Sequence, residues 1–514
     1  MAASQRLILP MSTNPSSVSG RRELLSQSMA SVSFLLGAGG DQRILPDAVH
    51  RRNRYGTLTT PADDEITFSS TTASNVSSEG FEAAGDALAR LVDLESAAPL
   101  AVYQWFSDIR DGIAGCLGCT DAEVVLAASG TDAELMALCL FSGLSRRPLT
   151  NILVAPDETG SGVPRAAAGC HYSGLTALGS AVEAGTALEG LPTDRIEVCT
   201  IAIRNAVGEP RHQNEIDDDM LAAVERELRR DRDVLVHVLD TSKTGLSGVT
   251  RQAARHAAAL APGRVHVIVD ACQFRCSISD IQQDLVDGFV VVVTGSKFVA
   301  GPPFSGALLV PPALCEAFAT KANIPAGLAA YTAAQDWPSA LRKRMTFAFG
   351  SEFNLGLGLR WVAASTYLDR YAEIAESLQA LIKAQFVRLV RARIESVEGI
   401  SLHADDEGAH LDLRAIVPFT VTNRTGAFAS FEESQNIHLL MRNFTDGAVC
   451  HLGQAVRLGP RTVLRVAASA MDVAAVSARM AAGQSLAQAF QPVESKLDTV
   501  FRKIAAVLHH VQTR

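Results

Sequence analysis

Two residues that end apolar runs, Lys297 and Asp270, have the types and the order that a covalent carbonyl chemistry requires. Lys297 closes the stretch "VVVVTGSK", and Asp270 closes the stretch "VHVIVD". Burying an ammonium or a carboxylate is costly unless the group meets a partner. A lysine that is held partly dry has a lowered pKa and becomes a nucleophile. Taken singly, each residue also has an ordinary interpretation: Lys297 as a solvated surface charge, and Asp270 as a helix cap.

Short polar turns follow two other apolar runs. "SGTDAE" places Gly130, Thr131 and Asp132 at the start of a helix-like segment, where free backbone N–H groups and the helix dipole favour a phosphate. An ordinary helix N-cap explains the same residues. The second turn, Asp240–Gly245, includes Ser242, whose hydroxyl is a candidate ligand contact.

The order of these signals along the chain matches the needs of pyridoxal phosphate. The amine of Lys297 binds its aldehyde, the carboxylate of Asp270 pairs with its protonated pyridine nitrogen, and the turn at Gly130 holds its phosphate. The sequence therefore predicts this cofactor at the carboxyl ends of the strands, where open α/β sheets bind ligands.

Composition and charge limit the class of protein. The chain has 514 residues, is 47% hydrophobic and carries a net charge of −9, so nucleic-acid binding is not expected. No apolar run reaches the roughly 18 residues of a membrane span. The nine cysteines are scattered, and the isolated pair Cys116 and Cys119 completes no metal site, so we expect no metal and a reducing, cytoplasmic setting. Residues 1–50 are rich in Ser and Arg with few acids, which leaves a transit peptide open.

The apolar runs predict an α/β fold with a mostly parallel seven-stranded sheet. Most of the runs lack alternation, so both faces of the sheet should be covered. The expected strands are 123–127, 151–155, 198–203, 234–239, 265–270, 289–293 and 307–310. The last one should be antiparallel, because only a short turn at Gly301–Pro303 precedes it.

Three units are expected along the chain. Residues 1–60 form an N-terminal arm, 61–345 the large domain and 346–514 a smaller α+β domain. The small domain should begin with one long helix over 355–393, contain strands at 414–421 and 462–466, and end in a helix from Leu497. An amphipathic helix is expected over 81–95.

The chain resembles the fold-type-I pyridoxal-phosphate enzymes, in particular the class V aminotransferase and cysteine desulfurase group. "VIVDACQ", "TGSKF" and "SGTDAE" carry this resemblance, which extends over most of residues 65–470. It implies that Lys297 is the Schiff-base lysine, that Asp270 binds the pyridine nitrogen and that Gln273 binds the phenolic oxygen. It places the following residues near the phosphate: Gly130, Thr131, Asp132, Thr294 and Ser296.

Further motifs of the same resemblance concern the substrate and the oligomeric state. "FGSEFNLG" implies that Ser351 reaches a neighbouring subunit's phosphate, hence a homodimer, and "VLRVAAS" implies that Arg465 clamps the substrate carboxylate. An exposed strand residue is an equally good interpretation of Arg465. Cys450 stands where some desulfurases carry a reactive cysteine, and His451 beside it is a candidate substrate contact. An inert core cysteine is the alternative for Cys450.

One departure from the group affects the chemistry. Desulfurases place a histidine over the cofactor ring, whereas "PDETGSG" at 156–162 has neither a histidine nor an aromatic residue. Glu158 or Thr159 is expected over the ring instead, which puts ordinary desulfuration in doubt because that histidine also moves protons.

These observations predict a pyridoxal-phosphate enzyme that acts on an amino acid. We favour transferase chemistry of the aminotransferase type, in a specialised biosynthetic step. A C–S or C–C lyase is the alternative, and Cys450 would favour it. A non-catalytic binding protein on the same fold is a further alternative. The glycines at 37–40 and 160–162 suggest a nucleotide site, but they do not form G-x-G-x-x-G between a strand and a helix.

Overall fold

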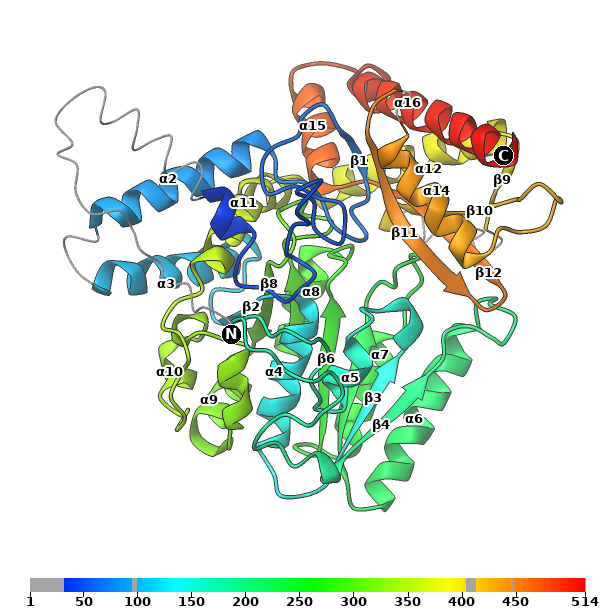
Figure 1. Ribbon diagram of the computed structural model, residues 1–514. Helices are drawn as coiled ribbons and strands as arrows, with labels where there is room; N and C mark the ends of the chain where they lie inside the picture. Colours follow the sequence, from blue (N-terminus) through cyan, green and yellow to red (C-terminus); the bar gives the residue numbers. More distant parts are fainter. Residues whose placement is uncertain (1–31, 95–98, 404–412, 445–446, 514) are drawn as a thin grey trace.

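The computed structural model describes residues 32–94, 99–403, 413–444 and 447–513 (Figure 1). Its lower part in this view is a large sheet covered by helices, and its upper right part is a second sheet with helices of the C-terminal third. Within the described residues, every helix is too short or too polar to cross a lipid bilayer.

The large sheet has seven strands in the order β2-β8-β7-β6-β5-β3-β4. The central pairs are parallel, and β8 is antiparallel to both β7 and β2, which confirms the predicted fold class and the predicted antiparallel strand. The strands are β2 Glu123–Ala127, β3 Leu149–Val154, β4 Ile196–Ile201, β5 Asp233–Leu239, β6 Val265–Ala271, β7 Val290–Thr294 and β8 Gly306–Val310.

Helices cover both faces of this sheet, as its continuous apolar strands require. Residues of α4 pack on one face, against Leu235 and Ile268, while α6 and α7 pack on the other, against Val234 and Val236. The helices of this part of the chain are α2 Ser78–Leu94, α3 Pro99–Cys116, α4 Gly130–Ser142, α5 Val163–Ala167, α6 Gln213–Arg229, α7 Arg251–Leu260, α8 Ile278–Val286, α9 Pro312–Lys321 and α10 Ser339–Arg342. Short 3-10 turns lie at Pro156–Glu158, Thr193–Arg195, Ala326–Ala330 and Ala334–Asp336.

The second sheet has five strands in the order β1-β11-β12-β10-β9. Four of them come from the C-terminal third, but β1 (Ile66–Phe68) pairs in parallel with β11. Residues 66–68, which fall within the predicted large domain, therefore extend the sheet formed by the C-terminal third. The remaining strands are β9 Ile400–Leu402, β10 Ile416–Val421, β11 Cys450–Leu458 and β12 Arg461–Ala467, and the helices are α11 Leu355–Ala372, α12 Glu376–Ser396, α14 Phe431–Asn443, α15 Ala470–Ala481 and α16 Leu486–Thr513.

The expected single helix over 355–393 is wrong: the chain forms two helices, α11 and α12. Glu373 ends the first, and Ala375 has an extended backbone with φ −54° and ψ 133° before the second begins. No Gly or Pro marks this break. Partly buried Ile374 packs on the main core, so tertiary contact accompanies the bend where local sequence gives no signal.

Residues 32–60 are held on the large domain by Arg360 of α11. Its guanidinium is fully buried and donates to the backbone oxygens of Phe304 (2.7 Å), Gly39 (2.8 Å) and Ala38. Burial lowers the pKa of Arg360 to about 9. One side chain therefore ties the N-terminal segment to the turn that precedes β8.

We expect Arg360→Met to lower the free energy of unfolding by about 2–4 kcal/mol, because it leaves several buried carbonyls without donors. Urea denaturation at constant slope measures this change. Arg370→Met on the same helix is the control, since its ion pair with Glu79 is exposed and contributes about 1 kcal/mol or less. Equal effects of the two substitutions would contradict the anchoring role.

Candidate active site

A cavity of about 190 Å³ lies at the carboxyl ends of the strands, between the large sheet and the second sheet. It collects residues that are far apart in the sequence. The predicted site residues that line it are Gly130, Thr131, Thr159, Asp270, Gln273, Thr294, Ser296, Lys297 and Arg465.

The N-terminus of α4 forms one wall of this cavity. Ser129 caps the helix by accepting from the backbone N–H of Asp132 (3.3 Å), so the N–H groups of Gly130 and Thr131 precede the first helical bond. A side chain at Gly130 would collide with the sulfur of Cys272 and lie 3.6 Å from Thr294. Glycine thus lets the helix start approach the ends of β6 and β7 without displacing the thiol of Cys272.

Asp270 lies in the last two residues of β6, where it pairs with Val292 of the neighbouring parallel strand β7, and Lys297 follows β7. One carboxylate oxygen of Asp270 accepts from the backbone N–H of Cys272 (3.0 Å). Gln273 donates to the carbonyl of Thr71 (3.0 Å), and its amide oxygen is buried without a hydrogen-bond donor. The strand ends therefore fix an amine, a carboxylate and an open amide oxygen around one space.

A buried acid–imidazole pair lies behind Asp270. Glu134 of α4 lines the cavity, and its carboxylate is 3.1 Å from Nδ1 of His237 on β5. Burial raises the pKa of Glu134, against the opposite pull of His237, and the nearby Asp270 raises it further. Sequence reasoning missed this pair, although both residues stand in elements that it predicted.

Arg465 of β12 reaches the cavity from the second sheet. It is 1% exposed and donates to the carbonyls of Lys243 (2.9 Å) and Gln454, while its Nε has no acceptor. Burial lowers the pKa of Arg465 to about 9. The interpretation of Arg465 as an exposed strand residue is therefore wrong.

The loop after β3 carries Glu158, whose carboxylate is bound by polar side chains. Glu158 forms an ion pair with Arg204 and accepts from the hydroxyls of Ser242 (2.8 Å) and Thr244. The hydroxyl of Ser242 therefore donates to Glu158, and Ser242 does not line the cavity. Its neighbours Thr241 and Lys243 line the cavity instead.

The N-terminal segment supplies cavity residues that no local sequence pattern indicates. Arg43, Arg54 and Tyr55 line the cavity together with Phe304. Arg43 forms an ion pair with Asp41 (2.6 Å) and lies 5.2 Å from the centre of the Phe304 ring. Only contacts over long sequence distances bring these residues to the site.

Three further predicted residues lie outside this cavity. Asp132 accepts from the hydroxyl of Tyr172 (2.6 Å), and burial raises its pKa to about 6, so it braces the start of α4. Ser351 donates to the carbonyl of Phe353 (2.9 Å) within its own chain. Cys450 is fully buried in β11, where burial raises the pKa of its thiol, contrary to a mobile and reactive cysteine.

His451 does not contact the cavity either, because a carboxylate on the N-terminal side holds it. Its Nε2 is 2.7 Å from Glu65, which also accepts from Arg52 and Asn75 (2.8 Å). Burial alone would raise the pKa of Glu65, but hydrogen bonds from His451, Arg52 and Asn75 lower it to about 2. Glu65 thus joins the N-terminal segment to β11.

We expect Glu65→Gln to destabilise the fold by about 1–3 kcal/mol at neutral pH, since buried donors lose a charged acceptor. The folded-state pKa lies below the ordinary 4.5, so the carboxylate stabilises the fold above pH 4.5 and loses this effect as the pH falls through about 2. The difference between wild type and variant in urea denaturation should therefore shrink in acid. Glu79→Gln is the exposed control, and a difference that stays constant with pH would contradict this role.

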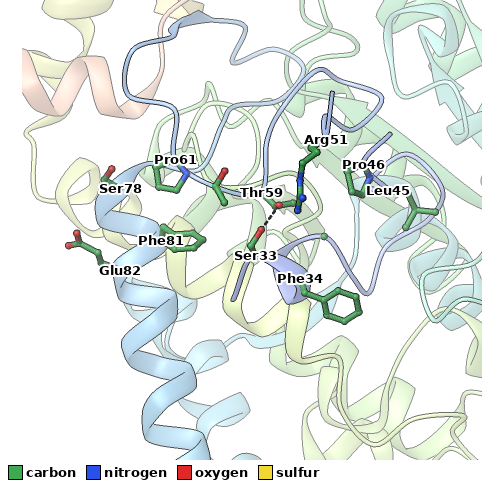
Figure 2. A pocket seen from close by; sticks show the side chains of 12 residues that line it. Ser33, Phe34, Leu45, Pro46, Arg51, Thr59, Pro61, Ser78, Phe81 and Glu82 are labelled. Carbon is green, nitrogen blue, oxygen red and sulfur yellow. Dashed lines mark hydrogen bonds between the residues drawn. The ribbon is translucent and has the colours of Figure 1, made fainter. Parts of the chain in front are cut away.

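A second, larger hollow lies away from these residues. Figure 2 shows this groove of about 720 Å³ between the N-terminal segment and α2, lined mainly by apolar surface. Phe34 and Phe81 lie on it, and the hydroxyls of Ser33 and Thr59 are 2.8 Å apart. It contains none of the predicted site residues.

Solved structures similar to this chain support the fold, whereas sequence comparisons find no match. No family model and no curated protein matches the chain. Oryza sativa TDC, crystallised with PLP and tryptamine, is 14% identical with a TM-score of 0.55, over 98% of this chain and 100% of that one. The cysteine desulfurase CsdA from Escherichia coli is 14% identical with a TM-score of 0.52, over 87% and 96%. Rhodiola rosea 4-hydroxyphenylacetaldehyde synthase is 13% identical with a TM-score of 0.53, over 97% and 100%.

The chain has the fold of type I pyridoxal-phosphate enzymes. Its cavity also fits that cofactor by its own chemistry. A lysine amine and a carboxylate follow adjacent strands, a glycine lets a helix start approach them, and an amide oxygen is left open.

Proposed function

We propose that this chain is an enzyme that binds pyridoxal phosphate through Lys297 and acts on an amino acid. The observation that carries this proposal is the convergence of Lys297, Asp270 and the start of α4 on one small cavity. Each of these features alone has an ordinary structural explanation. Together, in one cavity, they are arranged as the cofactor requires.

Bound pyridoxal phosphate withdraws electrons from the α-carbon of an attached amino acid. In this proposal, Asp270 pairs with a protonated ring nitrogen, and the amide oxygen of Gln273 faces the ring's hydroxyl. The N–H groups of Gly130 and Thr131 bind the phosphate with the hydroxyl of Ser296. The amine of Lys297 would move protons at the α-carbon of the substrate. Thr159 would lie on the cofactor side of the cavity.

Lys297 should be the single point of covalent attachment. After incubation with pyridoxal phosphate, borohydride reduction followed by peptide mass spectrometry should find the added group on Lys297 of the wild type. Lys297→Ala should show no visible cofactor absorbance and no added group, whereas the exposed-lysine variant Lys321→Ala should match the wild type. A wild type that takes up no cofactor would leave a binding scaffold as the function, and a label on another lysine would overturn the assignment.

We propose transferase chemistry of the aminotransferase type. Arg465 supports an amino-acid substrate, because a buried guanidinium with an unpaired Nε suits a carboxylate. The burial of Cys450 and its position outside the cavity give no support to a desulfurase route. A lyase that breaks another bond at the substrate remains the alternative.

The fate of the amino nitrogen distinguishes these reactions. With a nitrogen-labelled amino acid and an added 2-oxo acid, a transferase should move the label into the new amino acid. A lyase should instead release sulfide, carbon dioxide or a carbon fragment, and it should not need the 2-oxo acid. Chromatography with mass detection measures both products, and Lys297→Ala is the control for uncatalysed transfer.

The proposal includes a homodimer and a cytoplasmic setting. In the dimer, Ser351 would reach the phosphate in the neighbouring subunit, and sedimentation of the loaded protein tests this. A stable monomer that keeps its cofactor would contradict it. All nine cysteines are free thiols, which is compatible with a reducing compartment.

A further inference from the structure

A second lysine, Lys243, shares the cavity with Lys297. It follows β5 in the sequence and is half-buried. Its backbone is fixed on both sides, because its N–H donates to the carbonyl of Glu158 (3.0 Å) and its carbonyl accepts from Arg465 (2.9 Å). Among the described residues, its side-chain nitrogen has no hydrogen-bond or ion-pair partner. The residue is therefore held at the cavity wall with a free ammonium.

Among the described residues, no carboxylate lies within ion-pair distance of Lys243 or Arg465. Arg465 and Lys297 both lower the pKa of Lys243, in addition to the larger effect of burial, to about 8. Glu158 also lines the cavity and opposes the lowered pKa of both Lys243 and Arg465, but its oxygens already accept from Arg204, Ser242 and Thr244. Exposed Asp157 opposes it as well.

This positive region is separate from the wall that suits the cofactor's phosphate. Gly130 follows β2, whereas Lys243 follows β5, and the strands β8, β7 and β6 lie between these two in the sheet. The α4 N-terminus offers its own free N–H groups, so a phosphate there needs no lysine. Lys243 lies instead beside Arg465, the residue that suits a substrate carboxylate.

We infer that the substrate is an amino acid with an acidic side chain, and that Lys243 and Arg465 together bind its two anionic groups. This inference rests on the proposed function. Two adjacent cations without carboxylate partners are stabilised by a ligand with two negative groups, and a neutral side chain would leave Lys243 desolvated and unpaired. Lys243 is thus a specificity-determining residue that the family resemblance does not supply.

The test compares ligands that differ only in charge. Calorimetric titration of the cofactor-loaded protein with L-glutamate and L-glutamine, and with L-aspartate and L-asparagine, gives two affinity ratios. We expect the wild type to bind the acidic member of at least one pair about tenfold more tightly or better. Lys243→Met should reduce this ratio to about twofold, mainly by weakening the acidic ligand, and Lys243→Gln should do the same. Lys321→Met is the control for a change of net charge far from the cavity.

Three outcomes would overturn the inference. The first is a wild type without preference for either acidic amino acid, and the second is a preference that survives in both Lys243 variants. The third is a loss of cofactor affinity in these variants, which would assign Lys243 to the phosphate. Failure of the proposed function is a different result, since the wild type would then not carry the cofactor on Lys297 before any amino acid is added.

Discussion

The close approach of α4 to the ends of β6 and β7 is the constraint on which the site depends. Gly130 favours it, since a side chain there would have to displace the thiol of Cys272. The contact brings the free N–H groups of a helix start next to the strand ends that carry Asp270 and Lys297. The parallel pairing of β6 and β7 brings Asp270 and Lys297 close together, because adjacent parallel strands end at the same edge of the sheet.

The large sheet was predictable because its signals are local. Most of its seven strands are apolar runs without alternation, and the short turn at Gly301–Pro303 leaves no room for a parallel crossover. Lys297 and Asp270 could be placed for the same reason, since a charge that ends a buried strand is conspicuous. The pairing of β1 with β11 had no such signal, because three residues join a strand nearly four hundred positions away.

The site was only partly predictable, because side-chain direction within a loop or strand depends on its packing. Ser242 and Lys243 are neighbours, yet the hydroxyl of Ser242 turns to Glu158 while Lys243 lines the cavity. His451 is hydrogen-bonded to Glu65, and Lys503 acts electrostatically on Cys450. Both partners are far away in the sequence, so no local pattern predicts these interactions. Tyr55 reaches the cavity from the N-terminal segment, which Arg360 binds at Ala38 and Gly39 and Arg442 binds at the carbonyl of Tyr55.

One cation that lines the cavity, Arg465, connects the two sheets. Arg465 belongs to the second sheet, but it donates to the carbonyl of Lys243 in the large domain and keeps its Nε open. In the inferred complex, an anion bound by both residues would contact elements of both sheets at once. Two cations, Lys243 after β5 of the large sheet and Arg465 of the second sheet, thus line one cavity, and the inferred preference for an acidic substrate depends on their proximity.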